Sequence, residues 1–137
     1  MQSHFDWSDD SFIQDFEGLK FPVASFNHEA HLRLAFLHIQ RFGLEQAIQN
    51  ITHQLKAYVN HLGVTDKYNE TLTVAAVFIV NHFQTISSHS DFQKFIEDNQ
   101  FLKKDFQKLV AKHYSFNIFE HPTAKTQYQA PDLLPFV

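Results

Sequence analysis

The sequence contains no cysteine. This absence excludes disulfide bonds, thiolate metal sites and cysteine nucleophiles, and it leaves only nitrogen and oxygen ligands for a metal ion. Glycine is also scarce, with three residues and no G-x-G pattern, so we expect no glycine-rich phosphate loop. The serines lack the setting of a nucleophile elbow, which argues against a serine hydrolase.

Basic residues are few as well. Eleven lysines and arginines stand against fifteen aspartates and glutamates, a net charge of −4 with neutral histidines, and the basic residues are scattered along the chain. We therefore expect no nucleic-acid partner. The N-terminal stretch MQSHFDWSDDSF is acidic and has no apolar run after a basic segment. It predicts neither a signal peptide nor a membrane span, and we expect a cytoplasmic protein.

Phenylalanine and histidine are abundant, with sixteen and ten residues in a chain of 137. Phenylalanine brings a large apolar area and no polar group, so the core should be aromatic. This length is typical of one domain and can bury a core without disulfides or metals. We expect a single helical domain over residues 1–137.

Apolar residues recur at three- and four-residue steps between capping and stop residues, a pattern typical of helices. The β-branched residues of segment 68–86 would also suit a strand, but its apolar run is too long for one and no second strand-like segment could pair with it. The six expected helices run from Ser8 to Gly18, Asn27 to Phe42, Leu44 to Gly63, Tyr68 to Ile86, Ser90 to Asn99, and Leu102 to His113.

The tail after these helices holds three of the four prolines, together with several apolar residues. It should be mostly irregular and pack on the helices. The predicted fold class is all-α, an irregular bundle of about five or six helices with an extended C-terminal tail packed on it.

His28 and His31 lie at the start of the second expected helix, and the helical period brings His38 within roughly 80° of them. A neutral imidazole near a helix N-terminus can bind a metal or accept a proton. The spacing differs from the zinc-protease motif, whose histidines are four residues apart. The alternative is that these are ordinary helix-surface histidines with water or backbone partners.

The stretch KYNETLT, residues 67–73, opens the fourth expected helix. Glu70 could act there as a metal ligand or general base, and Tyr68 as a hydrogen-bond donor. The alternative interpretation is that Asn69 caps the helix, Glu70 complements its dipole, and the threonines bond to nearby backbone.

Three short motifs resemble an uncharacterised family of small, predominantly helical proteins, which show F-x-H-x-x-H-L, K-Y-H-x-T-x-T and a C-terminal tail with Tyr-Ser, Ala-Arg and Pro-Asp-Leu. The matching residues are Phe26, His28, His31 and Leu32, then Lys67, Tyr68, Thr71 and Thr73, then Tyr114, Ser115, Ala124, Pro131, Asp132 and Leu133. Asn69 stands where the family pattern has a histidine, and Lys125 where it has an arginine. The resemblance implies that His28, His31, Tyr68 and Thr71 converge, and it brings no known reaction.

We therefore expect a small-molecule or divalent-metal site at the N-termini of the second and fourth helices. His28, His31 and Glu70 are the candidate ligands of a zinc, iron, nickel or manganese ion, and Tyr68, Thr71 and Lys125 are the candidate ligand-binding residues. In an enzymatic version, a histidine would act as general base or metal ligand, and Tyr68 or Lys125 would stabilise developing negative charge. The alternative is a non-catalytic interaction module or a homodimer.

Overall fold

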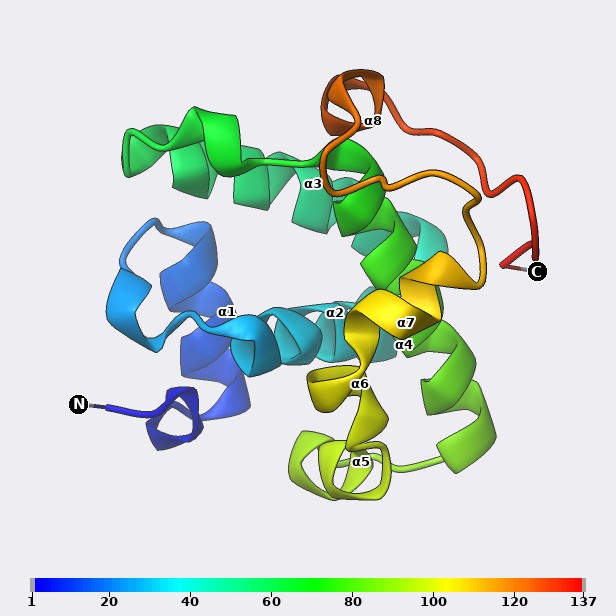
Figure 1. Ribbon diagram of the computed structural model, residues 1–137. Coiled ribbons are helices and arrows are strands. Elements are labelled where there is room, and N and C mark those ends of the chain that lie inside the picture. The colour runs from blue at the N-terminus through cyan, green and yellow to red at the C-terminus, as the bar shows by residue number, and fades with distance from the viewer. Residues whose placement is uncertain (1, 137) are drawn as a thin grey trace. The chain divides into compact units, whose positions relative to one another are not determined.

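The computed structural model describes residues 2–136, and this part of the chain is helical with no strand (Figure 1). The α-helices are α1 (Asp9–Glu17), α2 (His28–Phe42), α3 (Leu44–His61), α4 (Glu70–Ser87), α5 (Phe92–Asp98), α6 (Phe101–Lys104), α7 (Phe106–Ala111) and α8 (Pro122–Thr126). Short 3-10 helices occupy His4–Asp6, Val23–Ser25 and Thr65–Lys67. The all-α prediction is confirmed. None of the helices within residues 2–136 has the length and apolarity that crossing a membrane requires.

The chain divides into two compact units, Met1–Tyr68 and Asn69–Val137, here called the N-terminal and C-terminal units. Each unit has its own buried core, and each is described by itself below. The expectation of one domain over residues 1–137 stays a prediction.

Two predicted helix starts are confirmed by their polar caps. The side chain of Ser8 accepts a hydrogen bond from the N–H of Ser11 (3.2 Å), and that of Asn27 accepts one from Ala30 (2.9 Å). Each cap satisfies an N–H group that has no partner within its helix. Gly43 lies between α2 and α3 with a φ of 84°, a left-handed conformation that favours glycine.

The N-terminal unit packs α1, α2 and α3 around aromatic side chains, as the composition predicts. Phe12, Phe16 and Phe36 are completely buried. Tyr58 is buried with them, and its hydroxyl donates to the carbonyl oxygen of Phe21 (2.7 Å). A polar group in this core thus has a partner.

The C-terminal unit is built on α4, an unbroken helix of 18 residues. Its β-branched residues therefore do not form a strand, and the prediction of a helix over this segment is confirmed. The short helix α8 packs against α4, in orange beside the start of α4 in Figure 1. The tail packs within this unit as expected.

Two boundaries differ from the sequence predictions. The fifth helix is capped by Asp91, whose carboxylate accepts from the N–H of Lys94 (3.2 Å), and not by Ser90. The expected sixth helix is two short helices, because the backbone of Asp105 leaves helical geometry with φ −127° and ψ 28°. The N–H of Asp105 closes α6 on Phe101 (2.8 Å), and α7 starts at the next residue.

Candidate functional site

The two histidines of the predicted site have different surroundings in the N-terminal unit. His28 is exposed at the first position of α2, whereas His31 is partly buried, with its ring 4.5 Å from that of Phe26. Burial, and to a smaller extent the charge of His28, lower the pKa of His31 to about 4. His31 is therefore neutral at pH 7, the form in which imidazole binds a metal or accepts a proton.

The same stretch of α2 carries a buried polar cluster that the sequence analysis missed. Its centre is Arg33, which is 4% exposed and donates to the carbonyl oxygens of His4 (2.6 Å) and Trp7 (2.9 Å) and to the carboxylate of Asp9 (2.8 Å). His4 is itself buried, and its Nε2 lies 2.7 Å from Oε1 of Glu29. These bonds hold the N-terminal segment on α2. The signal in the sequence was the spacing of Glu29 and Arg33, two charged residues four positions apart on α2.

The KYNETLT stretch holds the tail of the C-terminal unit. Asn69 caps α4 at the N–H of Leu72 (2.9 Å), and its amide also donates to the carbonyl oxygen of Ile118 (2.8 Å). The hydroxyl of Thr71 donates to the carbonyl oxygen of Gln127 (3.0 Å) and accepts from the N–H of Gln129 (3.0 Å). The capping alternative is therefore correct for Asn69. Thr71 is fully buried, and its role in ligand binding stays a prediction.

The tail motif has a similar structural role. The hydroxyl of Tyr114 donates to the carbonyl oxygen of Gln129 (2.7 Å). The N–H of Ser115 donates to Asp132 (2.9 Å), and the Ser115 hydroxyl donates to the same carboxylate. These hydrogen bonds lower the pKa of Asp132. Two of the three motifs that carry the family resemblance, KYNETLT and the tail motif, thus hold the tail against the rest of the C-terminal unit.

The remaining predicted residues lie in both units. Tyr68 ends the N-terminal unit, with Nζ of Lys56 5.5 Å from the centre of its ring. Glu70 opens α4, and Lys125 lies in the last turn of α8, both in the C-terminal unit and both partly exposed. Over residues 2–136, no group of three or more His, Cys, Asp or Glu side chains could hold a metal ion. Convergence of the predicted site residues stays a prediction.

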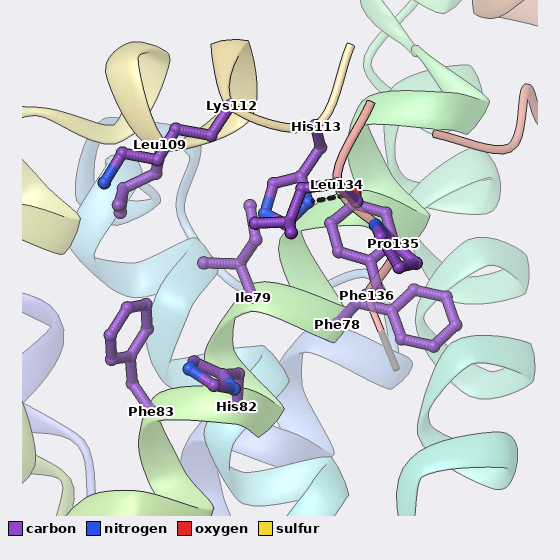
Figure 2. Close-up of a pocket in the computed structure, with 10 residues that line it drawn as sticks. All are labelled: Phe78, Ile79, His82, Phe83, Leu109, Lys112, His113, Leu134, Pro135 and Phe136. Carbon is purple, nitrogen blue, oxygen red and sulfur yellow. Dashed lines mark hydrogen bonds between the residues drawn. The ribbon is translucent and has the colours of Figure 1, made fainter. Parts of the chain in front are cut away.

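The C-terminal unit has a partly open cavity of about 500 Å³ on one side of α4, shown in Figure 2. Its lining is mainly apolar and comes from α4, from α7 and the residues just after it, and from the tail. The lining residues are Phe78, Ile79, His82, Phe83, Leu109, Lys112, His113, Leu134, Pro135 and Phe136. The volume is in the range of small-molecule sites, roughly 300–1,000 Å³.

The tail forms one wall of this cavity and is held there by His113. Nδ1–H of His113 donates to the carbonyl oxygen of Leu134 (2.7 Å), the dashed line in Figure 2, and the N–H of Leu133 donates to the carbonyl oxygen of His113 (3.0 Å). The ring of Phe136 stacks on Phe78 with centres 5.0 Å apart and lies 4.3 Å from the ring of His113. The wall is therefore formed by residues far apart in sequence.

No family model, curated protein or solved structure matches the chain. The resemblance to the small helical family stays a prediction, and the function is inferred from the side chains of this chain alone.

Only three of the described side chains that line the cavity are polar, and all three carry nitrogen groups. Lys112 brings a positive charge, His82 and His113 bring ring nitrogens, and none of the described lining residues is acidic. In the sequence, His82 interrupts an otherwise apolar segment, and His113 lies at the end of the last expected helix. The sequence analysis did not predict a site at these residues, since their proximity depends on how the tail folds back.

Proposed function

We propose that this protein binds a small amphipathic anion, an apolar molecule carrying a carboxylate, in the cavity of the C-terminal unit. The observation that carries the proposal is an apolar cavity of about 500 Å³ with a lysine and two histidines in its lining and no acidic side chain among its described residues.

The apolar part of the ligand is inferred from the walls. Phe78, Ile79, Phe83, Leu109 and Phe136 offer aromatic and aliphatic surface and no hydrogen-bonding group. An alkyl chain or ring that enters this space leaves water, which is the main favourable term in the binding of such molecules.

The charge of the ligand is inferred from Lys112. This residue is exposed at the end of α7, so its ammonium group stays hydrated while it attracts an anion. Since none of the described lining residues carries a negative charge, a carboxylate meets no repulsion inside the cavity.

Calorimetric titration with decanoate tests this function, with decanol as the uncharged comparison. We expect saturable binding of decanoate, weakened about fivefold or more by Lys112→Gln, which removes one charge contact, with decanol unaffected. Lys104→Gln is the matched control, because Lys104 is an exposed lysine of α6 outside the cavity lining. Absence of decanoate binding, or equal weakening by both substitutions, would contradict the proposal.

A divalent ion at His28 and His31 is a separate proposal that the sequence alone supports. Metal analysis of the purified protein tests it, and bound metal that the double substitution His28→Ala and His31→Ala removes would support it. Sedimentation velocity tests the alternative of a homodimer.

A further inference from the structure

The N-terminal unit has a second cavity, of about 370 Å³, near the end of α1 and between the end of α2 and α3. It is more polar than the cavity of the C-terminal unit. Its lining residues are Glu17, Leu19, His38, Phe42, Asn50, His53, Gln54 and Ala57.

Two buried polar atoms in this lining have no hydrogen-bond partner among the described residues. They are Nε2 of His38, on a side chain that is 1% exposed, and Oε1 of Gln54. Buried polar atoms in proteins nearly always have a partner, so such a pair in one cavity indicates a ligand that supplies both missing bonds.

The hydrogen bonds of Asn50 determine which of these atoms donates. Oδ1 of Asn50 accepts from the amide of Gln46 (2.7 Å), so Nδ2 of Asn50 is the group that faces Nδ1 of His38 (3.3 Å). Nδ1 therefore accepts, and in a neutral ring the proton of His38 is on Nε2. Burial and the charge of Arg41 lower the pKa of His38 to about 4, which keeps this ring neutral at pH 7.

This arrangement disfavours a metal ion at His38. A metal would need the lone pair of Nε2, but that nitrogen carries the proton. The carbonyl oxygen of Gln54 can only accept. These two atoms thus offer one neutral donor and one neutral acceptor, in a lining that holds the apolar side chains of Leu19, Phe42 and Ala57 and the polar side chains of Glu17, Asn50 and His53.

We propose that this cavity binds a small neutral molecule of the amide class, whose carbonyl oxygen accepts from Nε2–H of His38 and whose N–H donates to Oε1 of Gln54. An aromatic or cyclic amide also fits the apolar part of the lining, where the ring of Phe42 lies 5.4 Å from that of His38. The site lies within the N-terminal unit and is independent of the anion site proposed for the other unit.

Benzamide is the probe, followed by NMR on protein carrying ¹⁵N-labelled histidine. We expect a saturable shift of the Nε2 resonance of His38 at millimolar benzamide, with its proton retained. Gln54→Met keeps the length of the side chain and removes the acceptor, so it should weaken benzamide binding about tenfold. Gln49→Met is the matched control on an exposed position of α3, and it should leave binding unchanged.

Benzoate distinguishes an amide ligand from a carboxylate ligand. It has no N–H that could donate to Oε1 of Gln54, so it should bind at least about tenfold more weakly than benzamide. If benzamide causes no saturable shift at His38, the orphan atoms are satisfied by water and the proposal is overturned. Equal affinity in the wild type and Gln54→Met, or tighter binding of benzoate, would overturn it too.

Discussion

The backbone N–H of Gln129 donates to the hydroxyl of Thr71 across 58 positions of sequence, at 3.0 Å. The same hydroxyl donates to Gln127, so one fully buried side chain of α4 holds two residues of the tail. The tail and α4 both contribute to the lining of the larger cavity. The tail is thus anchored at the start of a helix with which it forms that cavity.

Thr71→Val should destabilise the C-terminal unit by about 1–3 kcal/mol, because it removes the two part-buried hydrogen bonds that the Thr71 hydroxyl makes with the backbone of Gln127 and Gln129, while it keeps the shape of the side chain. Urea unfolding measures this loss. Thr85→Val is the control, since Thr85 is exposed and its hydroxyl bonds only within α4, to Asn81 (2.8 Å). Equal effects of the two substitutions would show that Thr71 does not hold the tail.

Arg33→Met should cost about 3 kcal/mol of stability, since it removes the hydrogen bonds that the buried guanidinium makes with the carbonyl oxygens of His4 and Trp7 and with the carboxylate of Asp9. Arg41→Met is the comparison, because the ion pair of Arg41 with Asp10 is exposed and should contribute less than about 1 kcal/mol. Thermal unfolding of both variants separates these values. A loss at Arg33 no larger than that at Arg41 would contradict the anchoring role.

Stability should fall as the pH is lowered from 7 toward 4. His31 and His38 have folded pKa values of about 4, below their ordinary value of 6.5, so in this window the unfolded chain binds more protons than the folded one. Each such histidine contributes a slope of about 1.4 kcal/mol per pH unit between its two pKa values, and this contribution is fully present above pH 6.5.

Urea unfolding at a series of pH values measures the slope. His31→Gln should flatten it, whereas His61→Gln, at an exposed position, should leave it unchanged. If His31→Gln leaves the pH dependence as it is in the wild type, His31 is not neutral in the fold.

Phe136→Ala should weaken decanoate binding about tenfold, because it removes the ring that stacks on Phe78 and forms part of the cavity wall. Leu133→Ala is the control, since Leu133 lies in the same tail but is 56% exposed and outside the lining. Calorimetric titration measures both affinities. Unchanged binding in Phe136→Ala would place decanoate elsewhere.

Local chemistry explains which parts of the fold were predictable. Ser8, Asn27 and Asn69 each accept a hydrogen bond from an N–H three residues later, so their residue types and positions suffice to predict a helix start. The break at Asp105 was not predictable in this way, because the apolar spacing across it fits one continuous helix.

The candidate sites depend on contacts between distant residues, and here the sequence was a weaker guide. It drew attention to His28 and His31, whereas the side chains of this stretch that hold the N-terminal segment are those of Glu29 and Arg33. The sequence shows residue types, but it does not show that His4, 25 positions from Glu29, lies beside it.

The sequence by itself determined the all-α class, the aromatic core and most helix boundaries, because periodicity and capping act over a few residues. Only the tertiary structure decided that KYNETLT holds the tail, that Phe136 closes a cavity against Phe78, and that His38 and Gln54 line one cavity. These are long-range contacts, and they depend on how helices and tail pack, which no local pattern specifies.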